Sequence, residues 1–215
     1  MQDLVYLIDI DNTLLDNDAV VADLRRHLLD AFGAEGEQRY WALFEELWRE
    51  HGYADYLGAF QRFRMERPRD PQAIDASQFL LHYPFAERVF PGALDAIAAL
   101  RRRARVVILS DGDAVAQPNK VERSGLLDAV DGDVLIYIHK EEMLDDVARR
   151  YPAGRYVMVD DKVRILAAIK AIWRERVTTV FVRQGSYAAD RAEVARYPPA
   201  DVAIDRIGEI VRVAL

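Results

Sequence analysis

The stretch LVYLIDIDNTL covers residues 4–14 and opens with an apolar run that leads directly into two aspartates. An apolar run without polar alternation is typical of a strand that is buried on both faces of a parallel sheet. Asp9 and Asp11 are two positions apart, so on an extended chain their side chains lie on the same side. Two like charges at the end of a buried strand repel each other, and this indicates a site that supplies a counter-charge.

Further short runs rich in Val and Ile recur along the chain, at residues 105–110, 134–138, 155–160, 177–182 and 201–204. Segments of helical periodicity separate most of these runs, at residues 92–103, 113–124, 140–151, 162–173 and 187–196. The alternation predicts an α/β core, doubly wound and Rossmann-like, with a mostly parallel sheet. In sheets of this kind ligands bind at the carboxyl ends of the strands.

One interval interrupts the alternation. Residues 18–88 carry no strand pattern but contain helical stretches such as YWALFEELWRE (40–50) and YLGAFQRFRMER (56–67). We therefore expect an all-helical cap module at 18–88, inserted into a core formed by residues 1–17 and 89–215. Large aromatic side chains of the module are expected to form its own hydrophobic core, namely Trp41, Phe44, Trp48, Phe60 and Phe63.

Composition and net charge argue against several kinds of site and partner. The 215 residues include no cysteine, which excludes disulfides, thiolate metal sites and a cysteine nucleophile. The net charge of −7 argues against a nucleic-acid partner, because phosphate contacts need clustered Lys and Arg. We find no uninterrupted apolar stretch of about 18 residues, and Asp3 and Asp9 come too early for a signal peptide, so we expect no membrane partner and a cytoplasmic location. The oligomeric state is left open between monomer and homodimer.

Polar residues at the ends of four predicted strands form a candidate site: Asp9, Asp11, Ser110, Asp111, Lys140, Asp160 and Asp161. The carboxyl ends of parallel strands meet at one edge of a sheet, so these side chains should lie together. Lysine is rare here, with four residues against twenty-five arginines, so Lys140 directly beyond a strand is notable. His139, beside it, is interpreted as a plain strand-end residue.

Clustered carboxylates need a counter-charge. Two of them at 4 Å repel by about 4 kcal/mol at an effective dielectric of 20, so the set must take up protons or bind a cation. Hard, partly open oxygen ligands suit Mg²⁺, which typically binds a phosphate as well. The Ser110 hydroxyl and the Lys140 ammonium would then hold an anionic substrate, and a carboxylate so placed can act as the nucleophile.

These residues and their order resemble the haloacid dehalogenase (HAD) superfamily. The likeness rests on DIDNTL at 9–14, LSDG at 109–112, Lys140 and VDD at 159–161. FPGALDAIAALR at 90–101 also resembles the segment by which such chains return to the core after a helical cap. The resemblance implies a phosphatase that uses Mg²⁺ to hydrolyse a small phosphorylated metabolite, a phosphomonoester, through an aspartyl-phosphate.

The resemblance also implies a role for each site residue. Asp9 would be the nucleophile and a metal ligand, and Asp11 the general acid/base, with only its backbone carbonyl on the metal. Three residues would bind the phosphate: Ser110, Asp111 and Lys140. Asp160 and Asp161 would complete the metal site, and which of the two is the inner ligand is left open.

The chain departs from the family pattern in three motifs, and in the fourth of the family's motifs Asp160 and Asp161 stand as a pair in place of the Gly-Asp form. Asp111 stands where the second motif usually has Asn, and Glu141 follows Lys140 where Pro is common. Lys120 and Lys162 are rivals to Lys140, although Lys120 is expected inside a helical segment and Lys162 at the start of one. We interpret Asp16 and Asp18 as the lead-in to the cap, with Asp18 as a helix N-cap.

Other functions remain open at this point. A haloacid dehalogenase would form the Asp9 ester at carbon, which requires neither a metal nor a leaving-group acid. A phosphomutase would share the aspartyl-phosphate. A non-enzymatic phospho-acceptor module of the receiver type would also combine acidic residues, a Ser and a Lys on a doubly wound sheet, but its acidic pair precedes the acceptor Asp. The natural substrate does not follow from the sequence.

Overall fold

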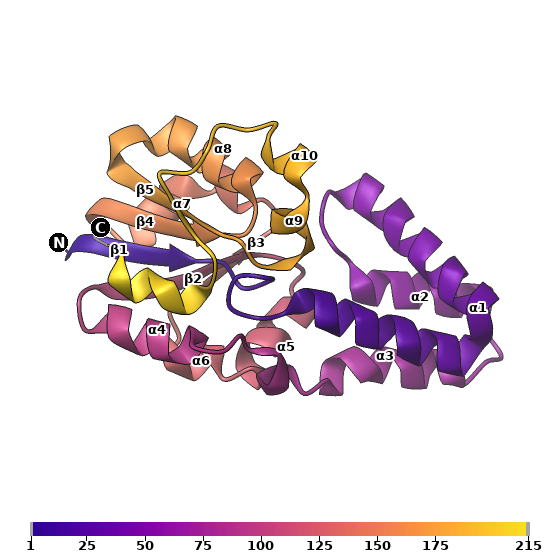
Figure 1. Ribbon diagram of the computed structural model, residues 1–215. Coiled ribbons are helices and arrows are strands. Elements are labelled where there is room, and N and C mark those ends of the chain that lie inside the picture. The colour runs from indigo at the N-terminus through magenta and orange to yellow at the C-terminus, as the bar shows by residue number, and fades with distance from the viewer. Residues whose placement is uncertain (1, 214–215) are drawn as a thin grey trace.

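The computed structural model describes residues 2–213 and contains a six-stranded parallel sheet in the order β3-β2-β1-β4-β5-β6 (Figure 1). The strands are β1 (Gln2–Ile8), β2 (Arg105–Asp111), β3 (Val134–Tyr137), β4 (Ala153–Asp160), β5 (Val177–Val182) and β6 (Val202–Ile204). Each lies on one of the predicted apolar runs, and the predicted doubly wound α/β fold is confirmed.

The first strand occupies the centre of the sheet. Ile8 at its end pairs with Ile108 of β2 on one side and with Val159 of β4 on the other. The strand order therefore reverses beside β1, and a parallel sheet binds its ligands at such a point, outside the carboxyl ends. In Figure 1 the arrow of β1 points towards the helical insertion, so this edge of the sheet faces the insertion.

Alternate residues of the strands separate the two layers of the core. Tyr6 and Ile8 face a hydrophobic cluster that includes α4 (Ala93–Arg101) and the 3-10 helix η4 (Ile207–Arg212). Val5 and Leu7 face a second cluster with helices α7 (Leu144–Arg150) and α8 (Val163–Trp173). Burial on both faces explains why the strands are apolar at nearly every position.

The remaining helical elements of the core are short. They are α5 (Ala116–Arg123), α6 (Leu126–Ala129), η2 (Lys140–Glu142), η3 (Arg174–Arg176), α9 (Gly185–Ala189) and α10 (Arg191–Val194). The helix predicted at 187–196 is thus two helices. The Asp190 side chain accepts hydrogen bonds from the amides of Ala192 and Glu193, so a new N-cap interrupts the segment.

The insertion consists of α1 (Asn17–His51), α2 (Tyr56–Glu66), α3 (Gln72–His82) and η1 (Phe85–Arg88). These helices lie to one side of the sheet, opposite the two chain ends (Figure 1). Gly33 interrupts α1 with φ 68° and ψ −178°, values that a residue with a side chain rarely adopts. The chain turns at this glycine, so that two helical halves pack together. None of the helices in residues 2–213 is apolar over enough length to span a membrane.

Aromatic side chains form much of the core of the insertion. Tyr40, Phe60 and Phe63 are buried, with the rings of Tyr40 and Phe60 4.5 Å apart between centroids. Trp41 is also buried, but Trp48 is 53% exposed. The expectation for Trp48 was therefore wrong, because its position on α1 faces solvent instead of α2. The buried aromatic residues belong to the same hydrophobic cluster as one face of the sheet.

The two connections between sheet and insertion run side by side. Leu15 and Val89 form an antiparallel bridge, the amide of Asp16 donates to the carbonyl of Arg88 at 2.8 Å, and the amide of Phe90 donates to the carbonyl of Leu14 at 2.9 Å. These paired segments join the sheet to the insertion.

Helix α1 is capped by a different aspartate from the one expected. The Asp16 side chain accepts a hydrogen bond from the amide of Ala19 at 2.9 Å, so Asp16 is the N-cap and the prediction for Asp18 was wrong. The side chain of Asn12, a residue with a φ of 60°, accepts hydrogen bonds from the amides of Asn17 and Asp18. The helix begins at Asn17, one residue before the predicted start of the insertion.

Candidate functional site

The nucleophile candidate lies between the two central strands. β1 ends at Ile8, and the amide of Asp9 donates to the carbonyl of Val159 in β4 at 3.0 Å. This hydrogen bond continues the pairing of the two strands by one residue. The Asp9 side chain is buried, at the point where the strand order reverses.

Lys140 is buried and forms two ion pairs. It opens η2 after β3, and its Nζ atom lies 2.5 Å from Oδ1 of Asp9 and 2.7 Å from Oδ2 of Asp160. The backbone amide of Lys140 donates to Oδ1 of Asp111 at 2.7 Å, so Asp111 helps to fix this residue. Burial acts to lower the pKa of Lys140, but the charges of Asp160 and Asp9 outweigh it and raise the pKa well above its ordinary value.

Three aspartates are placed to hold a cation. Asp9, Asp160 and Asp161 are buried, and one carboxylate oxygen from each lies within 4.8 Å of the others. Oδ1 of Asp160 accepts a hydrogen bond from the amide of Lys162 at 2.8 Å. Both oxygens of Asp161 are buried, and no donor among residues 2–213 reaches either of them. Buried carboxylate oxygens without donors are costly, so this cluster fits a metal ion of the Mg²⁺ type.

Burial also shifts the protonation of this cluster. It raises the pKa of Asp9 to about 7, although the charge of Lys140 acts in the opposite direction. Burial, and then the charges of Asp160 and Asp9, raise the pKa of Asp161 well above its ordinary value. Without a cation Asp9 and Asp161 therefore hold a proton more readily than carboxyl groups in water do.

Asp11 faces a different set of partners. Its Oδ1 atom accepts from Nζ of Lys120 at 2.6 Å, and its Oδ2 atom accepts from Nε2 of Gln117 at 3.3 Å. The same Nε2 atom donates to Oγ of Ser110 at 2.9 Å. Lys120 also donates to Oδ1 of Asn17, the first residue of α1.

The structure brings all seven predicted site residues to one edge of the sheet, but two neighbours were missed. Gln117 had no role in the sequence analysis, and Lys120 was set aside because it lies within a helix. It does lie in α5, yet its side chain turns inward. The scarcity of lysine was the available signal, since three of the four lysines surround the site: Lys120, Lys140 and Lys162.

Two more side chains lie near these residues, Lys162 of the core and Tyr56 of the insertion. Nζ of Lys162 lies 4.7 Å from the ring centroid of Tyr187. Burial acts to lower the pKa of Lys162, but the charges of Asp9 and Asp161 outweigh it and raise the pKa above its ordinary value. Burial, and then the charge of Asp11, raise the pKa of Tyr56 at the start of α2. The start of α2 therefore lies close to Asp11.

A second contact involves the strand-end histidine. Gly52, which ends α1 with φ 78°, packs so closely on His139 that a Cβ atom at this glycine would lie 3.0 Å from the ring. His139 thus forms part of the surface on which the cap rests.

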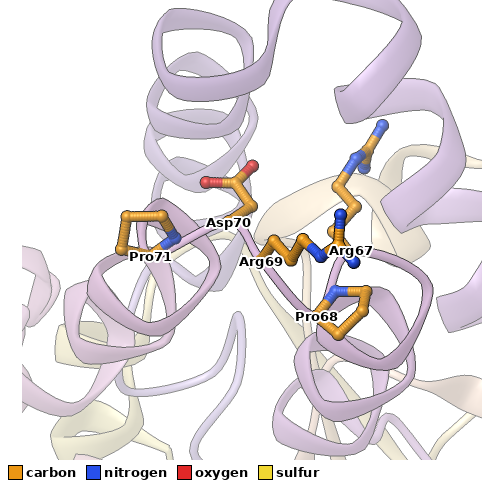
Figure 2. Close-up of a pocket in the computed structure, with 5 residues that line it drawn as sticks. All are labelled: Arg67, Pro68, Arg69, Asp70 and Pro71. Carbon is orange, nitrogen blue, oxygen red and sulfur yellow. The ribbon is translucent and has the colours of Figure 1, made fainter.

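Two surface pockets lie away from these residues. One is formed at the loop between α2 and α3, where Figure 2 shows five lining residues, Arg67, Pro68, Arg69, Asp70 and Pro71. This loop is at the far end of α2 from Tyr56, and an 11-residue helix is about 16 Å long. A second pocket lies between α1, α3 and η1 and is lined in part by Asp23, His27 and Tyr83. Neither contains a residue of the carboxylate site.

Comparisons with known proteins identify the family of the chain. A model of the haloacid dehalogenase-like hydrolase family matches residues 5–172. The chain belongs to this family. The crystal structure of a haloacid dehalogenase-like hydrolase from Burkholderia xenovorans LB400 is 59% identical in sequence, with a TM-score of 0.94 over 99% of this chain and 96% of that one.

More distant members of the family share the fold. An L-2-haloacid dehalogenase from Xanthobacter autotrophicus, with chloropropionic acid covalently bound, is 16% identical, with a TM-score of 0.65 over 97% of this chain and 96% of that one. The HAD-hydrolase YfnB from Bacillus subtilis, bound to magnesium, is 18% identical, with a TM-score of 0.65 over 99% of this chain and 98% of that one. No curated protein matches the chain.

Proposed function

We propose that this hydrolase is a Mg²⁺-dependent phosphatase that acts on a small phosphomonoester and uses Asp9 as its nucleophile. The observation that carries the proposal is Asp161, whose two oxygens are buried and have no donor among the described residues. With Asp9 and Asp160 it forms a three-carboxylate set that fits a divalent cation. The magnesium-bound structure of YfnB, which has the same fold, supports this choice of ion.

The balance of charges in the site also supports binding of a divalent cation. Five carboxylates lie at this edge of the sheet: Asp9, Asp11, Asp111, Asp160 and Asp161. The three lysines supply only three positive charges. The excess is two negative charges when all the groups are ionised, and one divalent cation would balance it.

In the proposed reaction a carboxylate oxygen of Asp9 attacks phosphorus, the bond to the leaving oxygen breaks, and Asp11 in its protonated form gives its proton to that oxygen. Asp11 then takes a proton from water, which attacks phosphorus and releases phosphate from Asp9. In this proposal Lys140 would neutralise Asp9 and the transferring group, and the Ser110 hydroxyl, which donates to the carbonyl of Asp111 in the structure, would donate to a phosphoryl oxygen. When bound at Asp9, Asp160 and Asp161, Mg²⁺ would supply the charge that polarises the phosphoryl group.

The proposal gives Asp111 an indirect role at the phosphate site. The earlier interpretation places it among the phosphate-binding residues, yet its carboxylate accepts the amide of Lys140. A carboxylate repels a phosphoryl group, so we propose that Asp111 serves the phosphate site by holding Lys140 in place.

Dehalogenation of a small haloacid is a second candidate. The observation that favours it is the 2.5 Å ion pair between Lys140 and Asp9, because a nucleophile neutralised by lysine can attack carbon without a metal. The fold shared with L-2-haloacid dehalogenases is compatible with it. It leaves Asp161 and Asp11 without a task, and we therefore rank it second. A purely regulatory phospho-acceptor is set aside because the chain belongs to a family of hydrolases.

One assay separates the candidates. Purified protein is incubated with p-nitrophenyl phosphate, with a panel of phosphorylated metabolites and with 2-chloropropionate, each with and without Mg²⁺. We expect release of phosphate only with Mg²⁺ and its loss in Asp9→Asn, with an unchanged circular dichroism spectrum. Equal activity in chelator would contradict the metal role, and release of chloride without release of phosphate would establish the second candidate. Transfer of phosphate between two positions of one metabolite would instead identify a phosphomutase.

A further inference from the structure

Helix α5 directs two buried polar side chains at one carboxylate. Lys120 is 5% exposed and Gln117 is 4% exposed, and each donates to a different oxygen of Asp11, at 2.6 Å and 3.3 Å. The two residues are three positions apart, so they lie on the same face of the helix. Both oxygens of Asp11 are therefore held by one rigid element.

The chain around α5 is shaped for this approach. Asp113 accepts hydrogen bonds from the amides of Val115 and Ala116, both at 2.7 Å, which anchors the start of the helix. A Cβ atom at Gly112 would lie 2.6 Å from Cβ of Gln117, so glycine is needed for the helix to pack this closely. The end of β2, this turn and α5 thus place Gln117 between Ser110 and Asp11.

Burial of Lys120 demands an explanation. A buried ammonium is costly unless it is paired, and the partners of Lys120 within the described residues are Asp11 and Asn17. Asp11 itself keeps 26% of its side chain exposed, so it can meet a substrate while its two oxygens are restrained. Asn17 is the first residue of α1, so Lys120 links the loop after β1, α5 and the first turn of the cap.

We propose that Lys120 and Gln117 are positioning residues that hold the Asp11 carboxyl group where a leaving-group oxygen will lie, turned away from the cation cluster. This inference rests on the proposed phosphatase function, in which Asp11 protonates the leaving group. Neither residue is asked to touch the phosphoryl group, and both act through Asp11.

The first test compares leaving groups. The variants are Lys120→Met and Gln117→Leu, and Lys170→Met is the matched control, because Lys170 pairs with Asp201 on another part of the core. On an alkyl phosphate, whose leaving oxygen needs a proton, we expect kcat for Lys120→Met to fall about 100-fold, as for partial loss of a general acid. On p-nitrophenyl phosphate, whose leaving group is stable without a proton, kcat should change by less than about 5-fold. Lys120→Arg should restore part of the loss.

An equal loss of kcat on both substrates, or a change in KM alone, would overturn the proposal, since a merely structural role would affect both leaving groups alike. If Lys120→Met folds poorly, Gln117→Leu provides the same test. We expect this variant also to lose kcat on the alkyl phosphate and not on p-nitrophenyl phosphate, with a smaller loss than in Lys120→Met.

A crystal structure of Lys120→Met is the readout that does not depend on activity. The proposal expects the Asp11 carboxyl group to leave its position beside α5, and an unmoved Asp11 would overturn it. If Asp11 moves but the wild-type protein hydrolyses no phosphate ester, the proposed function fails and the positioning of Asp11 by α5 stands.

Discussion

The ammonium of Lys140 lies 2.5 Å from Oδ1 of Asp9, although 131 residues separate the two in the chain. Asp9 follows the central strand β1 and Lys140 follows β3, two strands away in the sheet. Only the parallel arrangement of the strands brings them together, because it gathers the carboxyl end of every strand at one edge. The buried ion pair is therefore a consequence of the fold.

Removing the cation from this pair should destabilise the protein. Lys140→Met leaves two buried carboxylates, Asp9 and Asp160, without their shared partner. We expect the free energy of unfolding to fall by about 3–5 kcal/mol, as for other broken buried ion pairs. Urea denaturation in the absence of Mg²⁺ measures this change. The control Lys170→Met removes a partly exposed ion pair and should cost less than about 1 kcal/mol. A similar cost for both variants would contradict the role given to the buried pair.

Replacing the unpartnered carboxylate should separate metal binding from folding. In metal-free protein at pH 8, Asp161→Asn removes a buried carboxylate that has no donor among the described residues, so the free energy of unfolding should rise by about 1 kcal/mol or more, the cost of a buried polar group without a hydrogen-bond partner. The same variant should lose most of the stabilisation by Mg²⁺, which for wild-type protein at 100 times Kd is about 2.7 kcal/mol. Thermal melts with and without Mg²⁺ report both effects. A metal-free variant less stable than the wild type would refute this account of Asp161.

Mg²⁺ should stabilise the protein more at pH 8 than at pH 5. Burial raises the pKa of Asp9 from 3.8 to about 7, so between these values the folded protein holds a proton that the unfolded chain has lost. For this group the free energy of unfolding therefore falls as the pH rises from 3.8 to about 7. Mg²⁺ competes with that proton, and its apparent affinity should increase over the same range. Isothermal titration at pH 5, 6, 7 and 8 tests the trend, and a pH-independent affinity would contradict it.

Replacement of two aromatic residues of the insertion by alanine should change the free energy of unfolding by different amounts. Phe63 is fully buried, and Phe63→Ala should cost about 3–5 kcal/mol of stability through lost burial and the cavity left behind. Trp48 is 53% exposed, and Trp48→Ala should change stability by less than about 1 kcal/mol. Urea denaturation curves of the two variants measure both changes in the free energy of unfolding. A large cost for Trp48 would restore the sequence-based expectation that it belongs to the core.

Much of the fold follows from local patterns. The strands read as apolar runs because both faces of the sheet are covered, and residues 18–88 read as helical because no such run occurs there. The helix boundaries were less predictable. Asp16 and not Asp18 caps α1, because the preceding loop closes on the side chain of Asn12 and the carboxylate of Asp18 accepts from the amide and the hydroxyl of Ser186, 168 positions further along the chain.

The sequence by itself determined which acids and which lysine stand at the strand ends, and the rule for parallel sheets was enough to place Asp9, Lys140 and Asp160 together. Only the tertiary structure decided the surroundings of Asp11. Whether Lys120 turns inward depends on how α5 packs against α3 and η1 of the insertion. Strand ends converge by topology alone, whereas the face that a helix presents is set by packing with elements far away in the chain, and no local pattern records it.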